Sequence, residues 1–284
     1  MIQLSIITIN RNNANGLRRT IESVINQTYD NFEYIIIDGA STDGSVQIIK
    51  DFLTIPSITS NEGRIKRGIS WISEPDEGIY NAMNKAIRLS KGKYLNFLNS
   101  GDWLVSSIVI DKMMESLPDC SIYYGNMLKI FPNGKTIRDT GGKGNISMMT
   151  FYRGTLNHSP TFIERRLFLK YGLYDETLKI VSDWKWFLIA IGLNNEIVKY
   201  INLDIAYFDM TGISNTNHKL EYEERRKVLK ELFPENVLID YDNNWKNISL
   251  VNRINNYRFT KWLFWFIERI LFKYEKLKMK SVVL

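Results

Sequence analysis

The feature that most constrains this chain is a regular alternation of short apolar runs and amphipathic segments over its first hundred residues. Runs rich in β-branched residues occupy 4–9, 32–38, 68–73 and 93–99, and apolar residues recur at helical spacing over 17–27, 46–53 and 78–90. Such runs suit strands that are buried on both faces. Their alternation with helices predicts βαβ units, and therefore an α/β fold with a mostly parallel sheet flanked by helices.

Polar side chains follow the carboxyl ends of all four predicted strands. They are Asn10, Asp38, residues 74–76 and Asp102. In open α/β sheets ligands bind beyond these strand ends, so we expect the polar residues to share one rim and to form a site. Taken alone, Asp102 in the turn FLNSGD could be only a polar turn residue, or its carboxylate could hold a metal ion.

The second half of the chain has a different pattern. Residues 120–131 and the segment around Thr136 predict a hairpin through PNG, and 196–210 a further strand. Helices are predicted over 165–180 and 182–193 around a glycine-containing turn, and a charged surface helix over 219–233.

Composition narrows the class of protein. The net charge of +6 lies in residues 253–284 and the rest of the chain is balanced, which disfavours a nucleic-acid-binding body. Cys120 is the single cysteine, so an internal disulfide is excluded and a reducing compartment is favoured. The N-terminus lacks a signal-peptide pattern, and no stretch of about 20 apolar residues occurs, so we expect a cytoplasmic chain.

Several common sites are absent from the sequence. Neither GxxxxGK[ST] nor a GxGxxG after the first strand occurs, which argues against an ATPase or a Rossmann dehydrogenase. Two histidines and one cysteine at these spacings do not form a zinc site.

The C-terminal segment 253–280 is basic and amphipathic. Its apolar residues form one continuous helical face: Phe259, Trp262, Leu263, Phe266, Ile267, Ile270, Leu271 and Tyr274. Trp265 and Phe272 fall outside that face and would be unfavourable on a purely aqueous surface. The helix could pack on protein, but we favour a membrane interface, where basic and aromatic residues are both accommodated.

Seven segments in order resemble family 2 glycosyltransferases with the GT-A fold, which is Rossmann-like. They are LSIITINRN, YIIIDGASTDGS, SEPDEGIYNAMNKAI, YLNFLNSGD, NHSPTFI, YDETLKIVSDW and TGISNTN. The resemblance is greatest to bacterial enzymes of colanic acid, O-antigen and capsule biosynthesis. It implies a catalytic domain over 1–217, followed by a helical extension over 218–284.

The resemblance implies an activity. This is inverting transfer of a sugar from a nucleotide donor, a UDP- or GDP-sugar, to a saccharide or lipid-linked oligosaccharide at the inner face of the membrane. The competing interpretation is a non-catalytic GT-A module that binds nucleotide or partner proteins.

The resemblance also implies a donor site. Thr8, Asn10 and Arg11 match the family's nucleotide pocket, and Asp38 matches the acidic residue that contacts the nucleoside. Asp76, with Asn84 and Lys85 on the following helix, would line the donor site. The alternatives are local, because Asp38 could serve an Asp-Gly turn and Asn84 and Lys85 could occupy an exposed helix face.

A metal ion is implied at FLNSGD. Relatives carry Asp-x-Asp there, and the carboxylates hold Mg²⁺ or Mn²⁺ against the donor pyrophosphate. This chain has Asn99 and Gly101 at the other two positions, so Asp102 is the one carboxylate left as a metal ligand. Mg²⁺ needs only one or two carboxylates when phosphates and waters complete its shell, and Asn99 could contact ribose or offer a weak carbonyl ligand.

By the same resemblance, the segment VSDWKWFL contains the residue that removes the proton of the acceptor hydroxyl. Relatives carry an acidic pair there, and this chain has Ser182 followed by Asp183, which we assign as the general base. Either residue could instead cap the helix. His158 matches a family histidine of the acceptor or phosphate region. The alternative is that this lone histidine makes hydrogen bonds with a purely structural role.

Overall fold

The computed structural model describes residues 2–54, 69–116, 120–143, 146–210, 217–255 and 257–282. The chain forms two compact units, Met1–Val228 and Leu229–Leu284. Most of the TGISNTN segment, residues 211–216, lies outside the described residues.

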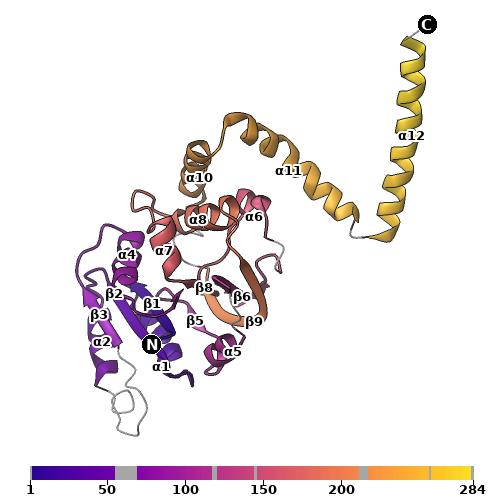
Figure 1. The fold of residues 1–284 in the computed structure, drawn as a ribbon. Coiled ribbons are helices and arrows are strands. Elements are labelled where there is room, and N and C mark those ends of the chain that lie inside the picture. Colours follow the sequence, from indigo (N-terminus) through magenta and orange to yellow (C-terminus); the bar gives the residue numbers. More distant parts are fainter. Residues whose placement is uncertain are drawn as a thin grey trace. The chain divides into compact units, whose positions relative to one another are not determined.

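The first unit is built on one sheet (Figure 1), with strand order β3-β2-β1-β4-β8-β6-β9-β5 and β7 on β6. The strands β1 (Leu4–Asn10), β2 (Phe32–Asp38), β3 (Ile69–Ser73) and β4 (Tyr94–Phe97) are parallel neighbours. The apolar runs of β1, β2 and β4 are buried on both faces, as predicted, whereas β3, at the edge of the sheet, is partly exposed. Asn10 pairs in register with Asp38, and Asp38 with Ser73, so these strand ends meet at one rim.

The second half of the sheet changes direction. Its strands are β5 (Trp103–Leu104), β6 (Ile122–Ile130), β7 (Thr136–Asp139), β8 (Thr161–Glu164) and β9 (Val198–Asp209). β8 is antiparallel to β4, β6 is antiparallel to β8, and β9 runs parallel to β6. The β6–β7 hairpin is confirmed. The α/β class and a sheet flanked by helices are therefore as predicted, and the sheet as a whole is mixed rather than mostly parallel.

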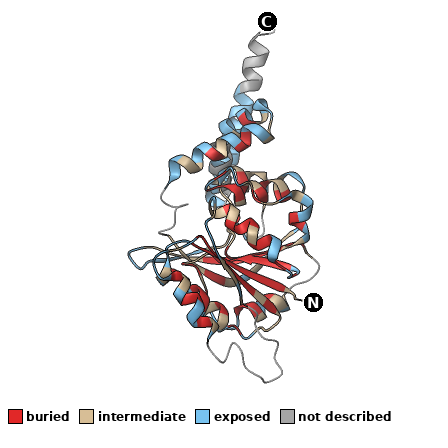
Figure 2. Ribbon diagram, turned by 90° about the vertical axis from the view of Figure 1, so that its left-hand side faces the viewer, coloured by how far each residue is buried: buried red, intermediate tan, exposed pale blue. Residues whose placement is uncertain are grey.

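Helices cover both faces of the sheet. α1 (Ala14–Ile25), α2 (Ser45–Leu53) and α5 (Val109–Glu115) share one core with alternate strand residues such as Leu4, Ile6 and Tyr34. α4 (Ile79–Leu89) packs against β1 and β2 from the other side (Figure 1). Figure 2 shows the result, with the central strands buried and the helices that cover them buried along one side.

Three further helices and a π-helical turn follow: α6 (Met148–Arg153), α7 (Arg166–Tyr171), α8 (Ser182–Phe187) and η1 (Leu188–Leu193). The helix predicted over 165–180 ends early, because Gly172 has φ +85° and redirects the chain. Residues 172–181 form a loop instead. That loop is held to α4, since Asn84 donates to the Tyr174 carbonyl (2.9 Å) and accepts from its N–H (3.0 Å).

The first unit continues past residue 217 to Val228. α10 (His218–Leu232) begins in this unit, and the Glu224 carboxylate accepts the backbone N–H groups of Lys179 (2.7 Å) and Ile180 (3.0 Å). Arg225 also places its guanidinium over the Trp184 ring, 4.7 Å from the centroid. These contacts hold the first part of α10 against the first unit.

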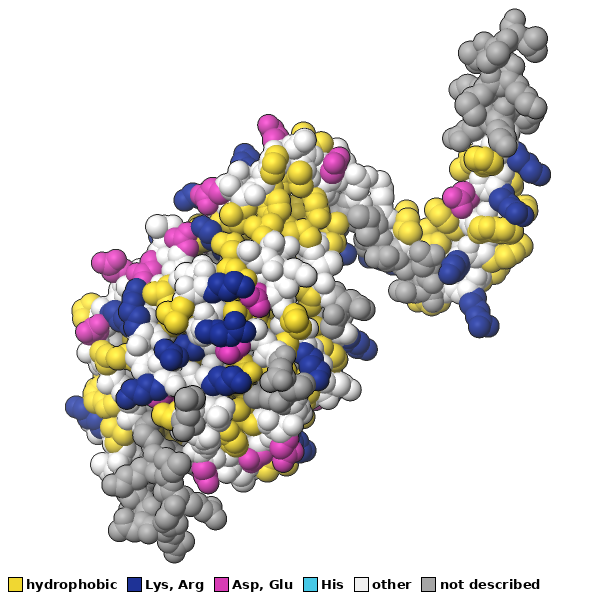
Figure 3. All heavy atoms as spheres, in the orientation of Figure 1, with side chains coloured by type: hydrophobic (Ala, Val, Ile, Leu, Met, Phe, Trp, Pro, Cys, Tyr) yellow, Lys and Arg dark blue, Asp and Glu magenta, His cyan; other side chains and the backbone are white. Residues whose placement is uncertain are grey.

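The second unit contains α11 (Glu235–Asn255) and α12 (Arg258–Val282). The predicted C-terminal amphipathic helix is thus present. Its large apolar side chains from Phe259 to Tyr274 are 40–70% exposed. Figure 3 shows hydrophobic and basic side chains side by side on the described part of α12. Among the described residues, no helix has the length and apolar character needed to cross a bilayer.

Candidate active site

A cavity of about 850 Å³ opens at the carboxyl ends of the parallel strands. Its walls come from the end of β1, the start of α4, the loop after β4, the segment before β8, the start of α8 and the end of β9. Most of the predicted site residues line it: Asn10, Arg11, Asp76, Asn99, Asp102, His158 and Asp183. Polar residues at the strand ends therefore do lie together, and they form one face of this cavity.

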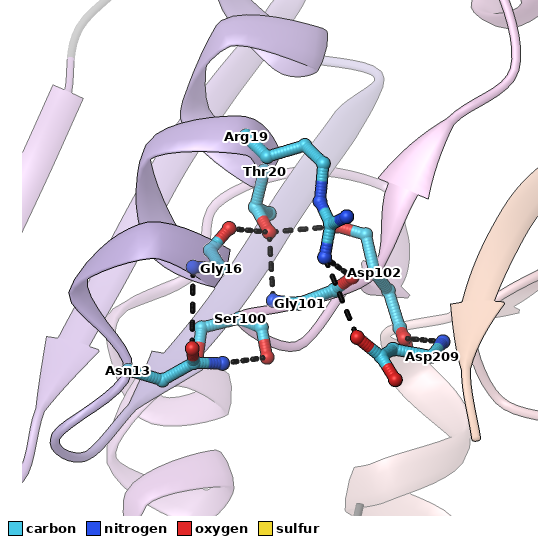
Figure 4. A network of polar contacts seen from close by, with 8 residues as sticks. All are labelled: Asn13, Gly16, Arg19, Thr20, Ser100, Gly101, Asp102 and Asp209. Carbon is cyan, nitrogen blue, oxygen red and sulfur yellow. Dashed lines mark hydrogen bonds and ion pairs between the residues drawn. The ribbon is translucent and has the colours of Figure 1, made fainter. Parts of the chain in front are cut away.

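The loop 99–102 is held to the first two turns of α1 (Figure 4). Asn13 caps the helix through the Gly16 N–H (3.2 Å) and donates to the Ser100 carbonyl (3.0 Å). The Thr20 hydroxyl accepts from the Gly101 N–H (3.0 Å) and donates to the Asp102 carbonyl (2.6 Å). Gly101 has φ +106°, a conformation that an L side chain adopts only under strain. The middle position of the Asp-x-Asp pattern is therefore closed to a carboxylate in this loop.

Asp102 itself is buried at the cavity wall. Its Oδ2 accepts the Ser159 hydroxyl (2.6 Å), and its Oδ1 accepts the Asp209 N–H (3.3 Å). Burial raises the pKa of Asp102 to about 6, against the lowering effect of Ser159 and His158. A buried carboxylate of this kind is stabilised by a nearby cation.

Asp209 is a second carboxylate at this wall, and it was not predicted. It ends β9 and lines the cavity, and its negative charge contributes to the raised pKa of Asp102. Arg19 pairs with its Oδ2 (3.5 Å), donates to the Gly101 carbonyl (3.2 Å) and lies over the Trp103 ring (3.9 Å). The signal that could have found Asp209 is an acidic residue closing a strand, as at Asp38.

Asp183 lies in the first turn of α8 and accepts three hydrogen bonds. His158 Nδ1 is 3.1 Å from its Oδ2, and Oδ1 accepts from the Tyr80 hydroxyl (3.0 Å) and from the Trp184 N–H (2.8 Å). The N-cap of α8 is Val181, so neither Ser182 nor Asp183 occupies the capping position. The Ser182 hydroxyl instead accepts the Asp175 N–H (2.5 Å).

His158 and Asp183 each stabilise the charged form of the other. Burial alone would raise the pKa of Asp183, but the hydrogen bond and charge of His158 outweigh it and hold that pKa below its ordinary value. Burial alone would lower the pKa of His158, but Asp183 outweighs it and raises that pKa. His158 Nε2 faces the Asn99 amide nitrogen (3.1 Å), so His158 connects the Asp183 wall to the Asp102 loop.

Asp38 and Thr8 lie behind the cavity and do not line it. The Asp38 carboxylate is fully buried and accepts from Asn10 (2.7 Å), Ser73 (2.7 Å) and the Ser41 N–H (3.0 Å). Burial raises the pKa of Asp38, but these donors together lower it below its ordinary value. The Thr8 hydroxyl is equally buried and donates to the Leu98 carbonyl (2.7 Å). Both groups hold the strand ends in place in this structure.

The predicted residues just before α4 and on it divide in the same way. Asp76 faces the cavity close to Arg11. A Cβ at position 39 would lie 2.3 Å from the Asp76 carboxylate, which explains why a glycine occupies that position. Asn84 is buried against the 174–176 loop. Lys85 pairs with Glu74 (2.7 Å) and donates to the Pro75 carbonyl (3.1 Å). Neither Asn84 nor Lys85 lines the cavity, because the helix turns both side chains toward other partners.

The residues at the Asp102 wall are compatible with a divalent cation. The buried Oδ1 atoms of Asn99 and Asn10, both cavity-lining residues, have no hydrogen-bond donor among the described residues. Oxygen acceptors without donors, beside Asp102 and Asp209, suit a hard cation. Within the described ranges no cluster of three or more acidic, histidine or cysteine ligands occurs, so phosphates and waters would have to complete the shell.

Comparisons with known proteins identify the family of the chain. Residues 5–177 match the family model for glycosyl transferase family 2. A PGL/p-HBAD biosynthesis glycosyltransferase of Mycobacterium bovis is 25% identical over 225 residues, covering 78% of this chain and 82% of the relative. An uncharacterized glycosyltransferase of Mycobacterium tuberculosis is 30% identical over 219 residues, covering 75% of this chain and 77% of the relative.

Solved structures share the fold. S. aureus TarS 1–349 in complex with UDP superposes with a TM-score of 0.58 at 16% identity, covering 73% of this chain and 60% of that 1–349 chain. The mannosyltransferase PcManGT of Pyrobaculum calidifontis, in complex with GDP-Man and Mn²⁺, gives 0.56 at 14%, covering 72% of this chain and 56% of that protein. This chain spans less than two thirds of either structure. With the match over residues 5–177, the chain belongs to glycosyl transferase family 2 and is a glycosyltransferase of the GT-A fold.

Proposed function

We propose that this enzyme transfers a sugar, with inversion and with a divalent cation, from a UDP- or GDP-sugar to a saccharide acceptor in bacterial surface polysaccharide synthesis. One observation carries the proposal: Asp102 and Asp183 line one cavity, and His158 contacts both Asp183 and Asn99, which lies in the loop that carries Asp102. Structural neighbours hold UDP, UDP-GlcNAc, and GDP-Man with Mn²⁺, which supports a nucleotide sugar as donor. A non-catalytic module would have no need of the second carboxylate.

The residues divide the chemistry between the two walls. The acceptor hydroxyl gives its proton to Asp183, its oxygen bonds to the anomeric carbon from the face opposite the leaving group, and the nucleoside diphosphate leaves with the electron pair of the broken C–O bond. Asp183 is ionised before the reaction because its pKa is held low. A weak base suffices, since the attacking O–H becomes acidic as the new bond forms.

The Asp102 wall would hold the cation. Asp102 and Asp209 supply carboxylate oxygens, and Arg11, which also lines the cavity, can pair with a phosphate. Mg²⁺ or Mn²⁺, when bound, supplies positive charge against the diphosphate that leaves. Asn10, Asn99 and Asp76 complete the donor side as hydrogen-bonding groups.

Thermal unfolding with nucleotides tests the donor site. With UDP, GDP and CMP, each with and without Mn²⁺, we expect one diphosphate to raise the unfolding midpoint only when the metal is present. A ligand at about 100 times its dissociation constant adds roughly 2.7 kcal/mol, which is several degrees for a chain of this size. The proposal fails if no diphosphate shifts the midpoint under either condition.

We further propose that the acceptor is lipid-linked and that the enzyme is cytoplasmic and peripheral on the inner face of the membrane, held through residues 253–280. Trp262 and Phe266 stack at 5.8 Å on α12 and are 57% and 47% exposed. Arg269 covers Trp265, with 4.1 Å between guanidinium and ring, which lets an off-stripe indole lie at headgroup level. Basic residues near anionic lipid contribute about 1 kcal/mol each.

Sedimentation with anionic liposomes tests the membrane contact. We expect a full-length double variant, Trp262→Gln with Phe266→Gln, to lose most of its sedimentation, because aromatic burial in the interface is lost. The matched control is Leu169→Gln with Ile197→Gln, which removes two apolar side chains that are 82% and 69% exposed in the first unit. Equal sedimentation of the two double variants would refute the role of α12.

A further inference from the structure

The Tyr80 hydroxyl reaches two acceptors but carries one hydrogen. Its oxygen lies 2.5 Å from the Ile180 carbonyl oxygen and 3.0 Å from Asp183 Oδ1. Tyr80 lies in the first turn of α4, is 4% exposed and lines the cavity. Burial and the nearby Asp183 carboxylate raise the pKa of Tyr80 well above its ordinary value, so the hydroxyl keeps its hydrogen. At any moment, therefore, one of the two contacts is donated by Tyr80 and the other is not.

We propose that Tyr80 is a positioning residue whose hydroxyl hydrogen follows the protonation state of Asp183. This inference rests on the proposed function, in which Asp183 is the general base. While Asp183 is ionised, the hydrogen points to Oδ1. When Asp183 holds the acceptor's proton on Oδ1, it donates to the phenol oxygen, and the phenol hydrogen turns to the Ile180 carbonyl.

This exchange keeps Tyr80 and Asp183 hydrogen-bonded to each other in both states, because a hydroxyl is both a donor and an acceptor, and the Ile180 carbonyl receives the phenol hydrogen only while Asp183 is protonated. The only movement is rotation about the bond from ring to oxygen. The ring itself is held by packing, with its centroid 5.6 Å from that of Tyr174. The proton that Asp183 gains is the one the acceptor loses, and no further reactant is needed. A site that needs little rearrangement during reaction retains more of its electrostatic advantage.

Tyr80→Phe is the direct test and Tyr174→Phe is its control. Tyr174 is buried beside Tyr80, and its hydroxyl has no hydrogen-bond partner among the described residues. Both variants lose one buried hydroxyl from adjacent rings, but only Tyr80→Phe loses a contact to Asp183. The donor probes are UDP-GlcNAc and GDP-mannose, with Mn²⁺ and with water as acceptor.

We expect Tyr80→Phe to lower kcat for donor hydrolysis about tenfold, the usual effect of one hydrogen bond to a charged group, with KM unchanged. Tyr174→Phe should match the parent. Azide distinguishes proton removal from general damage, because it attacks the anomeric carbon and has no proton to lose. The rate of glycosyl azide formation should therefore be equal in the parent, Tyr80→Phe and Tyr174→Phe.

The outcomes separate this inference from the proposed function. Full activity in Tyr80→Phe while Asp183→Asn is inactive overturns the role of Tyr80 and leaves the function standing. A fall in both hydrolysis and azide rates in Tyr80→Phe also overturns it, because the residue would then only maintain the site. Full activity in Asp183→Asn, or no turnover of either donor by the parent, removes the proposed function and the inference with it.

Discussion

Replacing Asp183 by asparagine is expected to lower kcat for sugar transfer about a thousandfold, within the range that general-base catalysis contributes. Asparagine keeps an oxygen for the Tyr80 hydroxyl and the Trp184 N–H but cannot accept a proton at neutral pH. The donor wall is unchanged, so the KM for the nucleotide sugar should stay within a few fold of the parent value. Steady-state kinetics with the donor identified by thermal unfolding measures both constants.

The control for Asp183 is Asp175→Asn. Asp175 lies in the loop that leads to α8, does not line the cavity and pairs with Lys185 (2.7 Å). That pair, with the hydrogen bonds from Thr177, offsets the effect of burial and lowers the pKa of Asp175 to about 2. Its loss should cost some stability and leave kcat near the parent value. An Asp183→Asn enzyme with parental kcat would contradict the assignment of the base and favour a binding module.

Replacing Asp102 by asparagine is expected to have opposite effects on stability and function. Burial raises the pKa of Asp102 to about 6 in the folded chain, above the ordinary value of 3.8. The folded state therefore holds its proton more tightly than the unfolded state does, and the stability this provides is lost as pH rises from about 4 through 6. In EDTA at pH 8, Asp102→Asn should unfold several degrees higher than the parent, from a gain of up to about 3 kcal/mol.

The same substitution should remove the effect of metal. Mn²⁺ with the matching nucleoside diphosphate should stabilise the parent at pH 8 and leave Asp102→Asn unchanged, because the carboxylate that faces the cation is gone. At pH 4 in EDTA, parent and variant should unfold at similar temperatures, since the parent carboxylate is then mostly protonated. A variant that keeps its metal-dependent shift would show that Asp102 is not the ligand.

Asp38→Asn is expected to change the unfolding temperature in the opposite direction to Asp102→Asn. Asp38 is as buried as Asp102, but three donors hold its pKa below the ordinary value. Its ionised form therefore stabilises the folded state above the unfolded pKa, and that contribution is lost as pH falls. In EDTA at neutral pH, Asp38→Asn should unfold at a lower temperature than the parent and Asp102→Asn at a higher one. Burial alone would predict the same direction for both.

Sequence reasoning located some of the cavity-lining residues and missed others. Asn10, Asp76 and Asp102 could be placed at the cavity rim because parallel strands end at one edge. Sequence reasoning could not show that Thr8, Asn84 and Lys85 lie outside the cavity. A strand buried on both faces and a short helix do not reveal which neighbour each side chain contacts. Asp209 was missed because β9 joins the sheet through β6 and β5, which are remote in sequence.

By itself, the sequence determined the α/β class, the presence of four parallel strands with polar residues at their carboxyl ends, and the amphipathic C-terminal helix. These features follow from local periodicity and from the end residues of each run. Only the tertiary structure decided the mixed half of the sheet, the meeting of Asp102 with Asp209, and the three donors on Asp183. Tyr80 and Asp183 are 103 residues apart, and such contacts depend on how separate elements pack, which no local pattern encodes.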